Sequence, residues 1–516
     1  MQTEKEYIAA REALGLRSES VGEYSLPDYN GDVKKVLAVK TKVFPSGKFV
    51  GDETLEFSGT VGYDVVYVDG EGAVTHAEFV TDYDAALRIN SESYADSDIH
   101  TEVSSCNVRL VGPRKFSVKT VLESDVFISE KKVHRITGDA FMEYEPEFLS
   151  RNAKVMSMEF AASDTREVEE EMTGLDGAIA DEVEILLCDA SGEVQSFEKN
   201  DHSVTVKGSI KVDMLYRNAD ASPVRLEKEI TYNDEVSLDY ANDFESVSPR
   251  IEVFNLKSAV VPTDDGVRLA VTVGALTRVR ATKNSLITLV SDAFLKERGT
   301  ENEYSDFNYS EYVCSGCSED KIELTQPLSD AELEGFSDIL YSSAAARVDE
   351  CEIQDNSVKI RGEVRFSGIA CQVNENEERV FMPVKISAPF EQNVNINCQN
   401  AGNIRINRHV SVDDVRMEID ANHLRASANL MCCVSLSADR KKHCLGASYI
   451  TDEEYTRDAS VVTVYYPDYG ENLFEIARKF HTSTRSIAES NRLTEAVFSS
   501  ETNSLGSLGV DKLIIK

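Results

Sequence analysis

The sequence predicts a mainly β protein with three tandem β-rich repeats of about 150 residues and a small C-terminal module of βααβ order. Three observations lead to this prediction. A strand-like segment that begins with glycine occurs three times, each copy is followed by a turn rich in Asn, Asp and Gly, and clear helical periodicity appears after residue 456. The chain has 516 residues, whereas about 100–200 residues form an ordinary domain, so several domains are expected.

The three copies of the strand-like segment begin at Gly59, Gly208 and Gly362, which are 149 and 154 residues apart. After each glycine, apolar residues alternate with other residues, which is the pattern of a half-buried strand. A period this long indicates an array of whole domains, because the repeats of a solenoid have about 20–50 residues. We interpret the glycine as a β-bulge or a close approach of two backbones, with a binding role as the alternative.

Each repeat is also expected to contain a β-hairpin. Asn, Asp and Gly tolerate positive φ angles and therefore mark hairpin tips. The turns are Asp69-Gly70, Asn218-Ala219-Asp220 and Asn374-Glu375-Asn376, and alternating segments follow at Val74–Val80, Val224–Ile230 and Val380–Ile386. The later half of the repeat recurs as well, because Val108-Arg109-Leu110 and Val415-Arg416-Met417 precede similar alternating segments, 307 residues apart.

Acidic, polar stretches mark the candidate boundaries between repeats. Asp164–Glu171 and Cys314–Glu323 are two such stretches. The predicted organisation is an N-terminal segment at 1–30, repeats at 31–160, 161–315 and 316–455, and the C-terminal module at 456–516.

The C-terminal module is predicted from short amphipathic segments. These are a strand at Val462–Tyr466, a helix at Asn472–Phe480, a second helix from Thr484 to about Ser490, and a closing strand at Lys512–Lys516. One face of the first helix is apolar and carries Leu473, Ile476, Ala477 and Phe480. Asn472 or Glu471 is expected to start the first helix, and Thr482 or Ser483 to cap the second.

This module resembles the LysM family. The resemblance lies in Gly470-Glu471-Asn472-Leu473-Phe474, Ile476-Ala477, Asn491-Arg492-Leu493 and Leu513-Ile514-Ile515. It implies a shallow groove for glycans that contain N-acetylglucosamine, bordered by Gly470, Glu471, Asn472, Leu473, Asn491 and Leu493. The chain has Gly-Glu-Asn-Leu where the family usually has Gly-Asp-Thr-Leu, and its stretch Thr494–Gly509 is longer than usual.

Repeats of this kind followed by one LysM resemble the SPOCS-domain proteins of endospore-forming bacteria, over residues 30 to 455. The resemblance implies a non-enzymatic scaffold in spore coat or envelope morphogenesis. It places the protein on the mother-cell side of the forespore, with the LysM docking a coat morphogenetic protein or a peptidoglycan glycan. The alternative is a cell-wall protein that binds peptidoglycan. The sequence leaves open whether the protein self-assembles.

Charge and hydropathy exclude other classes of partner. Asp and Glu number 91 and Lys and Arg 54, a net charge of −37, which argues against binding to nucleic acid or to anionic lipid. No stretch of about 18 apolar residues is present, so no membrane insertion is expected. The first residues lack a basic region followed by an apolar core, so we expect no signal peptide and a cytoplasmic location.

Motifs for catalysis are missing, and we expect neither an enzyme nor a cofactor. The sequence has no His-Glu-x-x-His, no phosphate loop and no Gly-x-Ser-x-Gly. Cys314 and Cys317 are the best candidates for metal ligands, which His443 and Cys444 could complete, but a plain pair of thiols in a loop is the default interpretation. Cys432 and Cys433 are expected to point to opposite faces of a strand, with one in the core.

Overall fold

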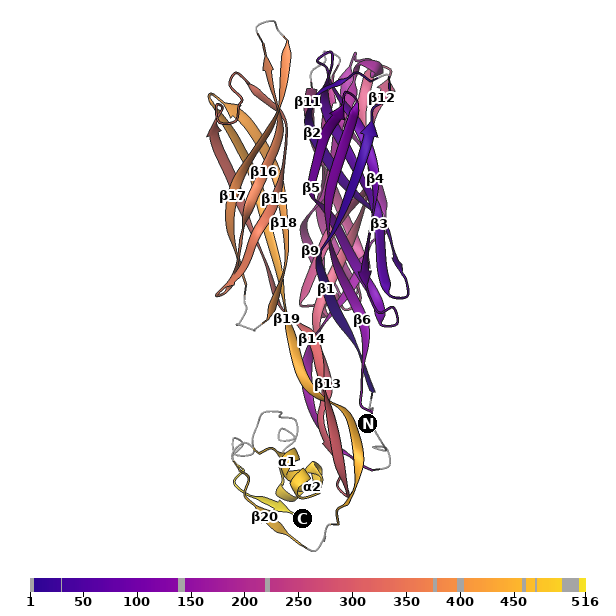
Figure 1. Ribbon diagram of the computed structural model, residues 1–516, viewed down its shortest axis with the longest axis vertical. Coiled ribbons are helices and arrows are strands. Elements are labelled where there is room, and N and C mark those ends of the chain that lie inside the picture. Colours follow the sequence, from indigo (N-terminus) through magenta and orange to yellow (C-terminus); the bar gives the residue numbers. More distant parts are fainter. Residues whose placement is uncertain are drawn as a thin grey trace.

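The computed structural model describes residues 4–28, 30–137, 144–218, 223–374, 378–396, 403–456, 461–468, 471–493 and 510–516. Strands account for 78% of the structure and helices for 4%, which confirms the mainly β prediction. Three elongated units lie side by side, and a stalk of long strands runs from them to a small helical module (Figure 1).

Each unit contains two sheets that share one core. In the first unit the sheets have the orders β1-β6-β5 and β2-β3-β4. These strands are β1 (Glu4–Ser25), β2 (Val33–Val50), β3 (Thr54–Asp69), β4 (Val74–Arg88), β5 (Tyr94–Gly112) and β6 (Lys115–Arg135). Phe57, Val61 and Tyr63 of β3 pack in one cluster with Phe116 and Leu122 of β6, so the two central strands face each other.

The second unit has the same order, except that two strands take the place of the first. They are β7 (Glu147–Ala162) and β8 (Arg166–Asp176), and both pair with β13. The other strands are β9 (Glu184–Lys199), β10 (Ser203–Arg217), β11 (Pro223–Ser237), β12 (Ser246–Thr263) and β13 (Gly266–Phe294), with short 3-10 turns at Ala180–Glu182 and Ala241–Asp243. The sheets are β9-β10-β11 and β12-β13-β7, the latter including β8.

The third unit contains the longest strands that the structure describes. Its sheets are β14-β19-β18 and β15-β16-β17. The strands are β14 (Arg298–Pro327), β15 (Asp338–Gln354), β16 (Ser357–Val373), β17 (Arg379–Asn395), β18 (Ile404–Asp420) and β19 (His423–Glu454). In all three units the last strand therefore pairs with both the first strand and the strand before it, and the other three strands form a meander.

This pairing differs from the predicted domain limits at three places. Residues 147–160, predicted in the first repeat, lie in β7 and pair with β13 of the second unit. Residues 4–25, predicted as a separate N-terminal segment, form β1 and pair with β6 of the first unit. Cys314–Glu323, predicted as a boundary, lies inside β14 and pairs with β19. Alternation along a sequence marks a strand but does not identify its partner, and in each place the partner is about 100 residues or more away.

The repeated glycines lie at β-bulges. Opposite Gly59, Gly208 and Gly362, the register of the preceding strand shifts by one residue. A Cβ atom on these glycines would overlap the carbonyl oxygens of Phe44, Glu193 and Arg347, respectively. The close backbone approach expected from the sequence is therefore present in each unit.

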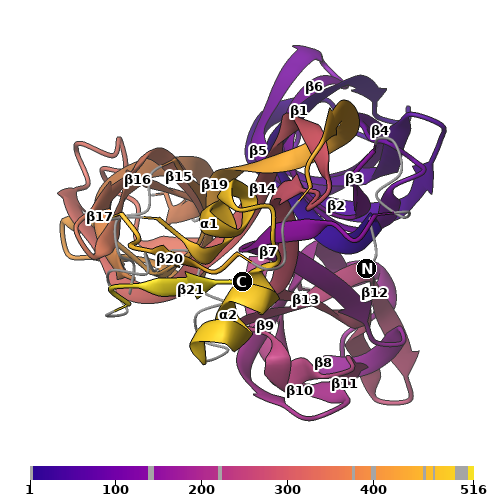
Figure 2. The same cartoon turned by 90° about the horizontal axis from the view of Figure 1, so that it is seen from below.

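The three units surround a common apolar centre, and the view from below shows them as three lobes (Figure 2). Val66, Leu215 and Ile369 belong to one buried cluster, and each stands seven residues after the repeated glycine of its unit. Tyr341 and Leu187 pack in the same cluster. The same position of the repeat therefore provides the contact between the units.

The stalk consists of the far ends of β7, β13, β14 and β19, and the C-terminal module lies at its tip (Figure 1). The module contains β20 (Thr463–Tyr465), α1 (Leu473–Lys479), α2 (Thr484–Asn491) and β21 (Leu513–Ile515). The observed order of these elements along the chain is the predicted βααβ, and strands β20 and β21 pair in antiparallel orientation.

We predict that Gly362→Ala destabilises the protein, because its Cβ would meet the backbone of Arg347 and the ring of Phe390. Overpacking of this kind costs about 1–3 kcal/mol, which thermal unfolding measures as a lower Tm. Gly47→Ala is the control, since no atom lies within 4 Å of its added Cβ. Equal Tm values for the two variants would contradict the bulge interpretation.

Candidate functional site

The helices of the C-terminal module begin at well-formed caps. The Asn472 side chain accepts a hydrogen bond from the Glu475 amide at 2.9 Å, and the Glu475 carboxylate accepts one from the Asn472 amide at 3.1 Å. This is a capping box. The Ser483 hydroxyl accepts a hydrogen bond from the Ser486 amide at 3.0 Å and caps α2. Both caps lie on residues that the sequence nominated.

The apolar face of α1 forms the core of the module, as its spacing predicts. Leu473, Ile476 and Ala477 are buried with residues of α2 and β21, and Phe480 packs against the edge of this cluster. Leu473 is therefore a core residue. Leu493, another residue of the expected groove, is partly buried against the same cluster.

Two polar residues of the expected groove form hydrogen bonds with the β20–β21 sheet. The Glu471 carboxylate accepts hydrogen bonds from the Tyr465 hydroxyl and the Asp468 amide, both at 2.8 Å. The Asn491 amide group donates to the Ile514 carbonyl and accepts from the Ile514 amide, both at 2.7 Å. Gly470 and Thr494–Gly509 lie outside the described residues. The described residues of the expected groove therefore all make contacts within the module. Glu471 bonds to β20 and Asn491 bonds to β21.

Contacts that the sequence did not suggest attach the module to the stalk. Arg478 of α1 forms an ion pair with Asp292 at 2.6 Å and donates to the Ala293 carbonyl at 3.0 Å. Asp292 also accepts hydrogen bonds from Asn302 and Tyr304 of β14. The guanidinium of Arg478 lies over the ring of Phe474, 5.0 Å from its centroid.

Two further contacts complete this junction. The ring of Phe474 meets the ring of Phe294 edge to face, with centroids 5.1 Å apart. The Glu147 carboxylate of β7 accepts a hydrogen bond from the Thr484 hydroxyl at 2.7 Å and one from its amide at 3.2 Å, at the start of α2. A carboxylate at a helix N-terminus is favourable because it interacts with unpaired amides and the helix dipole. Both helices are therefore fixed to the stalk.

We predict that Arg478→Ala loosens the junction between module and stalk, because it leaves the partly buried Asp292 without its cation. The loss is expected to be about 1–3 kcal/mol and to appear as faster amide hydrogen exchange in α1. Arg485→Ala is the matched control, since Arg485 pairs only with Glu489 on the surface of α2 among the described residues. Unchanged exchange in Arg478→Ala would contradict this role.

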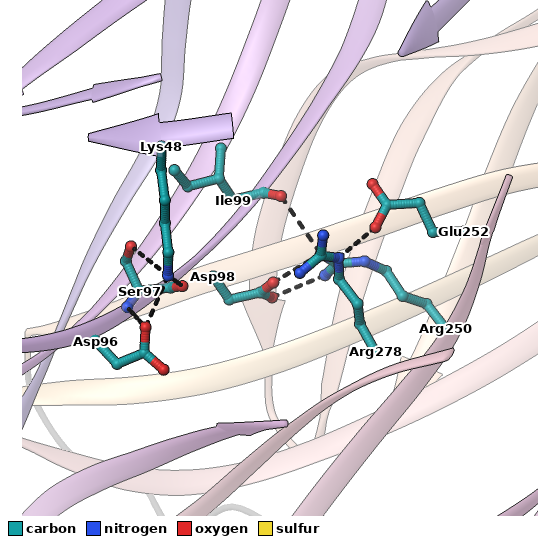
Figure 3. Close-up of polar contacts among 8 residues, drawn as sticks. All are labelled: Lys48, Asp96, Ser97, Asp98, Ile99, Arg250, Glu252 and Arg278. Atoms are coloured by element: carbon teal, nitrogen blue, oxygen red, sulfur yellow. Dashed lines mark hydrogen bonds and ion pairs between the residues drawn. The ribbon is translucent and has the colours of Figure 1, made fainter. Parts of the chain in front are cut away.

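Arg250 of the second unit makes polar contacts with Asp98 and Ile99 of the first (Figure 3). Asp98 accepts two hydrogen bonds from the Arg250 guanidinium, at 2.7 and 2.8 Å. Burial opposes ionisation of Asp98, but the charge and hydrogen bonds of Arg250, together with the charges of Arg280 and Arg278, outweigh it and hold the pKa of this carboxyl below its usual value. Arg278 pairs with Glu252 within the second unit, and Lys48 pairs with Asp96 at 2.7 Å within the first. The contact between Asp98 and Arg250 therefore orients the two units, and the other two pairs lie on either side of it.

A cleft next to these pairs is lined by both units and includes His100, Arg250, Val43 and Gly192. The His100 ring lies 6.1 Å from that of His409 of the third unit. Burial lowers the pKa of His100 to about 3, and the nearby charge of Arg250 adds to the effect. Burial likewise lowers the pKa of His409. Both rings are thus neutral at pH 7. The residues that line the cleft do not form an arrangement typical of a catalytic site.

We predict that His100→Asn gains stability relative to the unmodified protein as the pH falls from 7 to 5. The pKa of His100 is near 6.5 in the unfolded chain and about 3 in the folded protein. Between these two pH values the unfolded chain binds a proton at His100 and the folded protein does not, so a falling pH favours unfolding. At pH 5 the difference is about 1–2 kcal/mol, measured by urea unfolding of both proteins at pH 7.5 and 5. Comparison with a variant is needed because Glu102, with its pKa raised to about 7, opposes this trend. Parallel pH profiles would contradict the prediction.

The cysteines are arranged differently from the predicted loop pair. Cys314 and Cys317 lie on β14 and, three residues apart on a strand, they point to opposite faces. Cys317 forms a disulfide with Cys433, directly opposite on β19. Cys432 is fully buried in the core of the third unit, so the prediction that Cys432 and Cys433 face opposite ways is confirmed. His443 and Cys444 pair with Ser305–Asp306, far along β14 from Cys314.

Comparisons with known proteins do not assign the chain to a family: no family model, curated protein or solved structure matches it. Within the described ranges, no group of three or more His, Cys, Asp or Glu residues is placed to hold a metal ion. In the same part of the chain, no helix has the length and apolarity needed to cross a bilayer.

Proposed function

We propose that the protein is a non-enzymatic assembly protein of the spore coat or envelope, and that its C-terminal module is the recognition end. The observation that carries this proposal is the junction at Arg478, Asp292 and Phe474. It holds a small module at the tip of a long body of packed units, which suits a protein that sets the position of a partner. The resemblance to SPOCS-domain proteins with a LysM supplies the biological setting.

The distribution of charge supports the same role. Residues 456–516 contain seven basic and eight acidic residues, a net charge of −1, so the other 455 residues carry −36 of the total −37. A strongly acidic body repels anionic surfaces, whereas a nearly neutral module approaches a partner without this penalty. Recognition is therefore expected at the module, with a coat morphogenetic protein as its partner.

The disulfide favours a second candidate function, a peptidoglycan-binding protein of the cell wall. Structural disulfides persist in oxidising compartments and are rare in the cytosol. Cys317–Cys433 is therefore easier to explain outside the cytosol than on the mother-cell side of the forespore. A glycan would then take the place of the protein partner at the module.

The full-length chain can distinguish the two candidates. It is incubated with insoluble peptidoglycan, with and without soluble chitin oligomers, and in parallel with a lysate of sporulating cells. The assembly role predicts no sedimentation with peptidoglycan above that of an unrelated acidic protein. It also predicts capture of a coat protein that is lost in the module variant Phe474→Asp but kept in Arg485→Ala. Sedimentation that chitin oligomers abolish would overturn the assembly role in favour of the wall-binding one.

A further inference from the structure

We propose that the module also joins two copies of this chain, through the free edge of β20. Strand β20 of one copy would pair with β20 of a second copy, antiparallel and across a two-fold axis at Val464. The result is a four-stranded sheet with the order β21-β20-β20-β21. This surface is separate from the residues of the expected groove and does not depend on the assembly role proposed above.

The two edges of the β20–β21 sheet differ. The outer edge of β21 is closed, because the Asn491 side chain bonds both the amide and the carbonyl of Ile514. Ile514 pairs with Val464 of β20. The backbone groups of Ile514 point away from β20, so Val464 and Ile514 form a pair without mutual hydrogen bonds. In such a pair the amide and carbonyl of Val464 point away from β21, towards the free edge of β20. No described residue bonds them, so within the described part of the module the edge of β20 is open.

The outward face of β20 is apolar. Val464 of β20 and the flanking residues Val462 and Tyr466 alternate along the chain and are 54%, 58% and 68% exposed, respectively. Tyr465, which lies between Val464 and Tyr466, turns inwards and packs against Phe480, with ring centroids 5.1 Å apart. Pairing of two β20 edges would place two such apolar rows side by side, and cross-strand pairs of this kind stabilise a sheet.

The edge also lacks the usual protection. Exposed edge strands in soluble proteins carry charged residues or bulges that prevent pairing with another chain. Residues 461–467 contain no charged residue, although charged residues make up 28% of the chain. Pro467 follows the strand and leaves the Val464 amide unaffected.

Charge and shape favour a second copy of this chain as the partner that pairs with the β20 edge. The outward amide and carbonyl of Val464 match those of another Val464 across a two-fold axis, so the edge is complementary to itself. The module is nearly neutral, and Figure 1 shows it at the end of the molecule remote from the three units, which carry most of the −36 charge. Pairing through the tips therefore keeps the two acidic bodies apart, whereas side-by-side association would bring like charges together.

The interface is small, because only the short β20 strand and its neighbours take part. Interfaces well below about 1,200 Å² form weak or transient complexes. We therefore expect a dimer that appears with rising concentration. Sedimentation velocity of the full chain over about 1–200 μM should show the mean mass rising from 57.2 kDa towards twice this value.

Two matched variants test the surface. Val464→Asp places a charge at the edge and should abolish dimer formation over the whole range. Val80→Asp makes the same change at a valine that is 62% exposed on β4 and should leave the dimer unchanged. Unchanged amide protection of α1 in Val464→Asp shows that the module is still folded. A monomer at every concentration, or a dimer that Val464→Asp leaves intact, would overturn the proposal.

Discussion

The structure depends on one constraint, the packing of the three units around a shared apolar centre. Val66, Leu215 and Ile369 fill this centre, and they occupy the same position in each repeat. Three bodies with a combined charge near −36 would otherwise repel one another. Burial of apolar surface on the central strands offsets this repulsion, at roughly 25 cal/mol per Å². The units therefore act as one body.

Ion pairs around the centre give the packing its specificity. Lys40 of the first unit pairs with Asp189 of the second at 2.6 Å. Glu184 of the second unit pairs with Arg217 of its own unit at 2.6 Å and also accepts a hydrogen bond from the Thr75 hydroxyl of the first unit. Burial of such pairs costs desolvation energy, so their net contribution to stability is small. Removal of one partner is nevertheless strongly destabilising, because it leaves the other charge buried without a counterion. The pairs thus favour one arrangement of the units over others.

The sequence could predict the elements because its pattern is local. The glycine-led segments form β3, β10 and β16, and the later recurring segments form β6, β13 and β19. These two sets are the central strands of the two sheets in each unit, which explains why both keep an alternating pattern: each has one face in the core. The caps at Asn472 and Ser483 could be predicted for the same reason, since a cap depends on residues three positions away.

Contacts between distant segments could not be predicted in this way. The pairing of β1 with β6, the disulfide Cys317–Cys433 and the ion pair Arg478–Asp292 join residues about 100 or more positions apart. Charged residues such as Arg478 are common near the end of a helix, so nothing in the local pattern distinguished it from Lys479.

The expected groove shows how family resemblance and structural role can coincide. Asn472 starts a helix, Leu473 fills the core and Asn491 closes the edge of β21, so each is needed for the fold of the module itself. A sequence motif made of such residues identifies the βααβ architecture more directly than it identifies a ligand. The same closure of β21 by Asn491 leaves β20 as the open edge of this small sheet. Recognition by the module is therefore better sought at surfaces that the fold leaves free than at the residues that build it.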